Sequence, residues 1–286
     1  MSIIGNFTAQ PNRVEMLIDF LKDNKKLYSK LNLEINFSPP NGKKKKEAKG
    51  STFKNVYIVT ESLGLVEIEN DMVKLKIENP KQLTSQIIKE AIFKDDFMKN
   101  DDFVLALSWL LVQNSESLNS LEWSGQVNNM VLKDLNEEFG ELDLTNNSNW
   151  QHFGYWAIYL GFATKISIGG KYYLCPDPTE AIEHEFKKVF KESKELLIRD
   201  FLEYLAKEIP VLEFGSVRSR ILDRAREGLQ LPDNLLSFST SLALLRLEKR
   251  GVISLEQKSD ADSFSLQNNS ENSRIISHIV YRGKVK

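Results

Sequence analysis

The feature that most constrains the fold of this chain is a pattern that occurs three times: a helical segment, a glycine and two short strands. The glycines are Gly64, Gly161 and Gly251, so the copies lie 97 residues (64 to 161) and 90 residues (161 to 251) apart. Solenoid repeats have much shorter periods, of about 20 to 50 residues. Each copy is therefore the size of a domain, with a glycine that supplies the left-handed end of a helix.

The segments after these glycines have the pattern of hairpins. Residues 65–69 and 72–75 predict two strands joined by a turn at Asn70-Asp71, and residues 162–168 and 171–174 predict two strands joined by Gly169-Gly170, a two-residue hairpin signal. In the third copy the first strand follows Gly251. Its return strand is either 263–266 or, after a polar loop, 274–281.

Apolar spacing places helices before each glycine. In the first copy, Val14, Leu17, Ile18 and Leu21 predict an amphipathic helix ending near 23–24, and a second helix starts at Ser51-Thr52. The middle copy predicts helices over 103–113 and from 149 to about 160. The third predicts helices over 195–205 and 239–250, with a break at 232–234.

Helices followed by a glycine and a hairpin are typical of the winged helix-turn-helix. The predicted fold class is therefore mostly α with short β-hairpins (α+β), as three tandem winged helix-turn-helix domains. These are winged-helix domain 1 (1–98), an acidic winged-helix-like domain 2 (99–186) and winged-helix domain 3 (187–286). The alternative is that helix-glycine-hairpin is a common αββ unit and that the recurrence is partly chance.

The formal net charge of −2 conceals three segments of different charge. Residues 1–100 hold 17 Lys/Arg against 13 Asp/Glu, residues 101–186 hold 3 against 13, and residues 187–286 hold 18 against 14. Local potential decides whether a polyanion can approach. The acidic middle segment would repel DNA, whereas the outer two segments would not.

A basic segment leads into the last helix of the first copy, which is its candidate recognition helix. A groove-reading helix with nearby lysines makes salt-dependent contacts with phosphate, and hydroxyl and amide side chains add hydrogen bonds. The candidate nucleic-acid-binding residues here are Lys43, Lys44, Lys45, Lys46, Lys49, Ser51, Thr52, Lys54 and Asn55. The alternative is a solvated loop, because Ser38-Pro39-Pro40-Asn41-Gly42 precedes the run.

The third copy has a second basic set, and arginine suits phosphate because its planar group makes bidentate contacts. The spacing places Arg220 and Arg224 on one helical face. The set comprises Arg218, Arg220, Arg224, Arg246, Lys249 and Arg250. Because Asp223, Glu227 and Glu248 are close in sequence, internal salt bridges are the alternative.

The candidate recognition helix of the middle copy is aromatic and has no Lys or Arg. Aromatic residues dominate both protein cores and interface hot spots. We interpret this segment as a spacer or a partner-docking surface, with the candidate partner-binding residues Trp150, Tyr155, Trp156 and Tyr159. Stacking on single-stranded nucleic acid would need a basic groove, which the segment lacks.

Enzymatic motifs are absent from the sequence: there is no phosphate-binding loop, nucleophile elbow, zinc-protease helix or calcium loop. The three histidines are isolated, and Cys175 has no second cysteine with which to form a disulfide or zinc site. Pro176-Asp177, Glu185 and Lys187 imitate a nuclease pattern, but helical periodicity over 179–190 would point Glu185 and Lys187 apart. We predict no enzyme activity, catalytic residue, metal, cofactor or small-molecule substrate.

The sequence also bears on location. No apolar run reaches the roughly 18 to 20 residues that would cross a bilayer, and the first residues lack a basic segment followed by an apolar one. We expect a cytoplasmic protein without a membrane partner.

Three features of the sequence carry a resemblance to a known family: the opening Met1-Ser2-Ile3-Ile4, the helix end Leu63-Gly64-Leu65-Val66-Glu67 and the three-copy layout. In these features the chain resembles the tandem winged-helix proteins of prokaryotic anti-phage defence clusters. It resembles in particular the winged-helix component beside the 7-deazaguanine DNA-modification enzymes. It also looks like the tandem winged-helix subunits that accompany SMC-type ATPases. These resemblances imply an accessory role: recognising DNA, or holding an ATPase or nuclease on it.

Three hypotheses follow. The first is a non-catalytic accessory protein of a multi-protein anti-phage defence or DNA-processing complex. Its first and third copies would bind double-stranded DNA, and its middle copy would engage a larger protein subunit such as an ATPase or nuclease. The second is an adaptor that docks on such a partner without DNA affinity. The third is a transcriptional regulator, although the sequence has no heptad or evident dimerisation helix.

Overall fold

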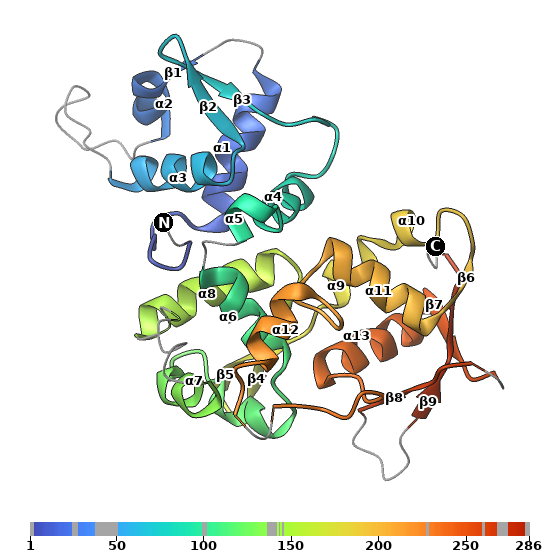
Figure 1. Cartoon of the computed structure of the whole chain (residues 1–286). Helices are drawn as coiled ribbons and strands as arrows, with labels where there is room; N and C mark the ends of the chain where they lie inside the picture. The colour runs from blue at the N-terminus through green and yellow to red at the C-terminus, as the bar shows by residue number, and fades with distance from the viewer. Residues whose placement is uncertain are drawn as a thin grey trace. The chain divides into compact units, whose positions relative to one another are not determined.

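The computed structural model describes residues 3–24, 28–37, 51–98, 102–135, 142, 144, 146–226, 229–258, 261–267 and 274–283. The chain forms two compact units, Met1–Asp101 and Asp102–Lys286. Both contain helices and short antiparallel strands, which confirms the mixed α+β class (Figure 1). The division into three domains stays a prediction, because the middle and third segments share one unit.

The first unit contains helices α1 (Pro11–Asp23), α2 (Lys30–Phe37) and α3 (Ser51–Ser62) and strands β1 (Tyr28–Ser29), β2 (Val66–Glu69) and β3 (Met72–Leu75). The strands form an antiparallel sheet in the order β1-β3-β2. Helices α4 (Thr84–Ile92) and α5 (Asp95–Met98) follow. The apolar faces of α1 and α3 are buried and form the core together with Val66 and Val73.

The β2-β3 turn is of the kind that the sequence predicts. Asn70 and Asp71 have φ values of 51° and 63°, as the type I′ hairpin turn requires. The three helix-ending glycines also have positive φ: 69° at Gly64, 82° at Gly161 and 70° at Gly251. The predicted left-handed helix ends are therefore confirmed.

The middle segment, in the second unit, contains α6 (Asp102–Leu111), the 3₁₀ helix η1 (Glu116–Ser120), α7 (Asn128–Asp134) and α8 (Asn147–Tyr159). Asn146 caps α8 by accepting a hydrogen bond from the backbone of Asn149. The hairpin of β4 (Ala163–Ile168) and β5 (Lys171–Pro176) follows, and Glu122 forms an antiparallel bridge with Tyr173 of β5. Helix α9 (Thr179–Glu183) ends the segment, and the short helix α10 (Phe186–Val189) leads into the third.

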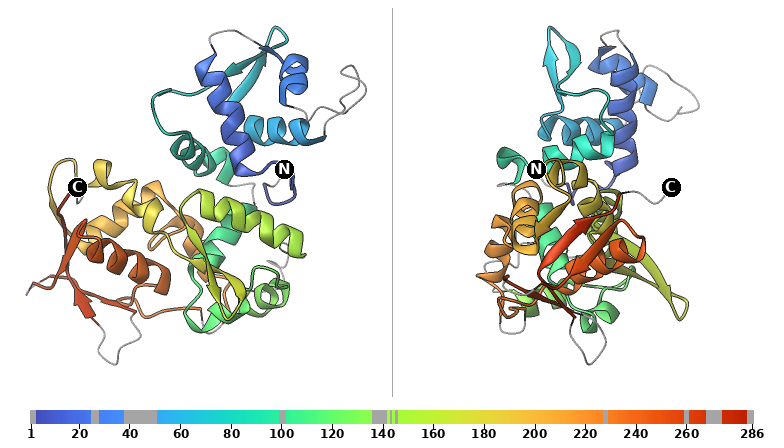
Figure 2. Two further views of the ribbon diagram at one scale, coloured as in Figure 1. Left: turned by 180° about the vertical axis from the view of Figure 1, so that it is seen from behind. Right: turned by 90° about the vertical axis from the view of Figure 1, so that its right-hand side faces the viewer.

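The third segment contains β6 (Glu195–Leu197), α11 (Ile198–Glu208), α12 (Ser216–Leu222), α13 (Phe238–Lys249), β7 (Ile253–Glu256), β8 (Phe264–Leu266), β9 (Arg274–Ile276) and β10 (His278–Tyr281). An antiparallel sheet has the order β6-β10-β7, and its helices lie to one side of it (Figures 1 and 2). The return strand of the third hairpin is therefore the later alternative, in 274–281. Strands β8 and β9 pair separately in the connection.

Three sequence expectations need correction. Residues 195–197 are a strand and not the start of a helix, because Leu196 pairs with Ile279 of β10. Helix α12 ends at Leu222, so Arg224 lies beyond it and shares no helical face with Arg220. The helical segment 179–190 is two short helices, although its apolar residues Ala181, Ile182, Phe186 and Val189 are buried as expected.

The three copies share an order of elements that the strand pairing makes visible. Each has a helix (α1, α6 or the short α10), a strand or bridge (β1, Glu122 or β6), two or three further helices, and then the two strands of the hairpin. In each, the last strand lies between the first and the second: β1-β3-β2, Glu122-β5-β4 and β6-β10-β7. In the described residues, no helix is long and apolar enough to cross a membrane.

Candidate nucleic-acid interface

In the first copy, the structure places part of the predicted basic site on the first turns of α3. Lys43, Lys44, Lys45, Lys46 and Lys49 lie outside the described residues, and Ser51 is the first residue of α3. Lys54 is exposed and Thr52 is half-buried. Asn55 Nδ2 donates a hydrogen bond to Thr8 Oγ1 at 2.8 Å, so this side chain holds the segment before α1.

Three other described cations of the first unit have partners within it. In the β2-β3 hairpin, Lys74 Nζ lies 3.0 Å from Glu69 and Lys76 Nζ lies 3.0 Å from Glu67. Lys30 Nζ lies 3.9 Å from the centre of the Tyr57 ring. Burial and the neighbouring Glu61 raise the pKa of Tyr57 to about 12, so its hydroxyl stays protonated. The two lysines of the hairpin thus each have a glutamate partner.

The middle copy uses its helix α8 mainly for the core. Trp150 and Trp156 are fully buried, and Trp150 Nε1 donates to the carbonyl of Glu122 at 2.9 Å. These two side chains are not on the surface where a partner could contact them. Tyr159 is half-buried, whereas Tyr155 is 44% exposed. Of the four candidate partner-binding residues, Tyr155 is the one that solvent reaches most.

The third copy pairs the arginines of its helix α13 with carboxylates of the middle copy. Arg246 forms an ion pair with Asp177, which is buried just before α9. Arg250 Nη1 lies 2.7 Å from Glu180 and 3.2 Å from Glu183, both on α9. The two arginines at this end of α13 are thus paired with carboxylates inside the unit. Lys249 is exposed.

The other three arginines of the predicted set differ in burial. Arg218 is buried, and its Nη2 lies 3.6 Å from the buried carboxylate of Glu213. Arg220 and Arg224 are exposed. Within the predicted set, Arg218 is therefore buried, and Arg246 and Arg250 are ion-paired at the end of α13. The exposed members are Arg220, Arg224 and Lys249.

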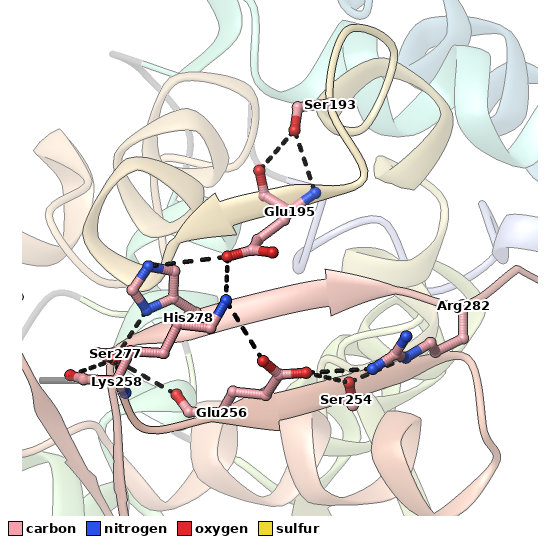
Figure 3. A network of polar contacts seen from close by, with 8 residues as sticks. All are labelled: Ser193, Glu195, Ser254, Glu256, Lys258, Ser277, His278 and Arg282. Carbon is pink, nitrogen blue, oxygen red and sulfur yellow. Dashed lines mark hydrogen bonds and ion pairs between the residues drawn. The ribbon is translucent and has the colours of Figure 1, made fainter.

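Further cations of the third copy are paired along its β6-β10-β7 sheet (Figure 3). Glu195 pairs with Lys258, and this hydrogen bond lowers the pKa of Glu195 below its ordinary value. Glu256 Oε1 accepts from Arg282 at 3.1 Å, and its Oε2 lies 3.5 Å from Lys258. Lys258 and Arg282 thus have carboxylate partners within the same segment.

The same network holds a serine, a histidine and a glutamate in a row. Ser277 Oγ lies 2.8 Å from His278 Nδ1, and His278 Nε2 lies 3.9 Å from Glu195 (Figure 3). However, Ser277 is fully buried, and its hydroxyl accepts a hydrogen bond from the backbone N–H of Lys258 at 2.8 Å. The row is therefore a strand-to-strand connection. Among the described residues, no three His, Cys, Asp or Glu side chains gather as a metal site would require.

Comparison with known proteins adds one finding. No curated protein and no solved structure matches the chain. A family model described as DpdG-like matches residues 1–261, well over half of the sequence. The chain therefore belongs to the DpdG-like family, which is part of the 7-deazaguanine DNA-modification (dpd) cluster.

Proposed function

We propose that this protein is a non-catalytic accessory component of the 7-deazaguanine DNA-modification and defence system, built from three tandem winged helices, and that it binds duplex DNA through its first copy. The shared order of elements supports the winged-helix assignment, because all three copies place the last strand between the other two. Family membership supports the context.

One observation carries the choice of the first copy. The arginines at the end of α13 are neutralised by Asp177, Glu180 and Glu183, and α8 has no charged residue. Helix α3 alone among the three is preceded by a lysine run and has an exposed lysine, Lys54, on its first turns. The sequence alone suggests that the first and third copies both bind DNA, whereas the present proposal assigns DNA binding to the first copy only.

Replacing Lys43, Lys44, Lys45 and Lys46 by Glu should remove most of the affinity for duplex DNA. Each phosphate contact releases counterions, so log K falls with log salt by roughly 0.9 for each contact. The variant should bind at least about tenfold more weakly at low salt and have a slope shallower by about three to four. Fluorescence anisotropy of a labelled duplex, measured over a range of salt concentrations, gives both quantities.

A matched control has the same charge change elsewhere. Lys187, Lys191, Lys194 and Lys207 are exposed on the second unit. Replacing all four by Glu changes the net charge equally, and it should leave the salt slope within about one unit of the wild-type slope. Equal losses in the two variants would mean that net charge, and not a surface on the first copy, controls binding.

The arginines of α13 give a separate prediction. Because Arg246 and Arg250 are already paired with carboxylates, replacing both by Gln should change DNA affinity by less than about twofold. The ion pair of Arg250 with Glu180 is exposed and contributes at most about 1 kcal/mol. Loss of Arg246 costs more, because the buried Asp177 loses its counter-charge. The same anisotropy titration, with circular dichroism as a check on folding, measures the effect. A loss as large as that of the lysine variant would place DNA on the third copy.

A second candidate is an adaptor without DNA affinity. Two observations in the second unit favour it: α13 packs against α9, and most of the aromatic residues of α8 are buried. The middle and third copies thus use their candidate recognition helices, α8 and α13, for contacts within the protein. Absence of duplex binding at low salt in the wild type would support this candidate and reject the first.

A further inference from the structure

The acidic middle segment contains a stretch without a single acidic residue. Residues 101–146 hold nine Asp/Glu and one Lys, and residues 177–186 hold four Asp/Glu and no Lys or Arg. Residues 147–176 hold no Asp or Glu and only Lys165 and Lys171. This stretch is α8 and the β4-β5 hairpin, which therefore have no acidic side chain, although acidic residues precede and follow them in the sequence.

The structure brings aromatic residues together on the surface of this stretch. Trp123 packs against the backbone of α8 at Gly154, where an added Cβ would lie 2.7 Å from the indole ring. Tyr155 meets Trp123 edge to face, with ring centres 5.1 Å apart. Lys165 Nζ lies 4.0 Å from the centre of the Trp123 ring and 4.7 Å from that of Tyr172. Helix and hairpin are thus joined through one aromatic cluster.

The outer members of this cluster are open to solvent. Tyr155 is 44% exposed, Tyr172 is 53% exposed, and Ile168 near the tip of the hairpin is 50% exposed. Figure 2 shows the β4-β5 hairpin projecting beyond the helices around it. Large apolar side chains on a projecting element are expensive to leave in water, because their burial is worth about 25 cal/mol per Å². We call Tyr155, Lys165, Ile168 and Tyr172 the aromatic wing surface.

Its composition matches a protein interface better than a nucleic-acid groove. The centres of protein interfaces are depleted in charge and enriched in aromatic residues, and tyrosine supplies large contact area at low entropic cost. Nucleic-acid binding requires several free cations. Here Lys171 pairs with Glu122 at 2.9 Å, and Lys165 lies over the aromatic rings.

We propose that the aromatic wing surface docks a protein partner whose contact segment has an apolar centre and Lys or Arg residues around it. The apolar centre would cover Tyr155, Ile168 and Tyr172. The basic residues would face Glu116, which is exposed on η1 next to β5, and could lie over the tyrosine rings as Lys165 lies over that of Tyr172. The proposal deepens and rests on the accessory role proposed above, and it identifies the surface through which that role is exercised.

The test uses the full-length chain with the photo-crosslinking residue p-benzoylphenylalanine in place of Tyr172. It is co-expressed with each of the other proteins of the 7-deazaguanine DNA-modification cluster in turn. We expect a covalent adduct with one of them, at a segment that contains Lys or Arg. The same photo-crosslinking residue in place of Phe214, which is 45% exposed on the third copy, is the control and should give no adduct.

Ile168→Asp is the second variant, because it places a charge at the proposed centre on a side chain that is half exposed and so should not unfold the protein. In the crosslinking experiment, Ile168→Asp should reduce the yield of the adduct by a factor of about ten or more. Replacing Lys43, Lys44, Lys45 and Lys46 by Glu should leave the yield of the adduct unchanged while it reduces DNA binding. The two proposals can thus fail separately. Absence of an adduct with every protein tested, an adduct with DNA or with a second copy of this chain, or equal adducts from both positions would overturn the proposal.

Discussion

Glu213→Ala should destabilise the second unit by about 3–5 kcal/mol, the usual effect of removing one member of a buried ion pair. The Glu213 carboxylate accepts hydrogen bonds from the backbone and hydroxyl of Ser237 and from the hydroxyl of Thr240, at the start of α13. Arg218, also buried, lies 3.6 Å away. Alanine would leave a buried guanidinium without its counter-charge and the start of α13 without its acceptor. Urea unfolding followed by circular dichroism measures the loss.

Glu213→Gln separates charge from hydrogen bonding, and its effect depends on pH. Burial acts to raise the pKa of Glu213, but Arg218 and the hydrogen bonds from Ser237 and Thr240 outweigh it, so the pKa lies below its ordinary value of 4.5. A carboxylate with a lowered folded-state pKa contributes stability above its unfolded pKa and loses it as the pH falls through the folded one. The wild type should therefore lose more stability than Glu213→Gln on acidification below about pH 4.5.

Two outcomes would contradict this account of Glu213. One is an alanine variant within about 1 kcal/mol of the wild type at pH 7, because a buried guanidinium left alone should cost more than that. The other is a free energy of unfolding that falls equally with pH in the wild type and in Glu213→Gln. Glutamine has no carboxylate to protonate, so the variant should lose less stability in acid than the wild type.

Gly161→Ala should cost considerably more than Gly64→Ala, although both glycines end the equivalent helix of their copies. Both have positive φ, where a Cβ costs about 1–2 kcal/mol. A Cβ on Gly161 would also lie 2.9 Å from the backbone nitrogen of Ala181 and 2.9 Å from the Cβ of Glu180, whereas around Gly64 no described atom beyond its chain neighbours lies within 4 Å. Overpacking of this kind adds about 1–3 kcal/mol.

Both variants are unfolded in urea. Unfolding of the second unit, which contains Gly161, is followed by tryptophan fluorescence, because all four tryptophans lie in that unit. Unfolding of the first unit, which contains Gly64, is followed by circular dichroism. Similar losses of stability would mean that α9 moves away from Gly161 at little cost. In that case Glu180 would be displaced from Arg250, and the ion pair between the copies would weaken as well.

The hairpins and helix ends could be predicted because their signals are local. Asn70-Asp71 and Gly169-Gly170 each specify a turn by their own backbone preferences, and apolar spacing specifies the buried faces of α1 and α3. Strand β6 could not be predicted, because residues 195–197 are extended only through pairing with β10, more than 80 residues later. Apolar spacing alone allows either a helix or a strand there.

The candidate sites were predictable only in part. A run such as Lys43 to Lys46 is visible in sequence, but the carboxylates that neutralise Arg246 and Arg250 come from a different copy. Helical spacing likewise does not say which aromatic residues of α8 are buried. Trp123 and Tyr172 were missed because they lie outside that helix, although the absence of acidic residues over 147–176 was a signal that could have found the surface.

The hydrogen bond from Ser239 to the carbonyl of Leu111, together with the pairing of Arg246 and Asp177, has a practical consequence for dissecting this protein. The boundary near residue 186 separates two copies in sequence but not in space. A fragment that ends there would leave the carboxylates of α9 unpaired and the apolar sides of α6 and α9 in water. The natural piece for expression, crystallisation or binding studies of this half is therefore residues 102–286 as a whole.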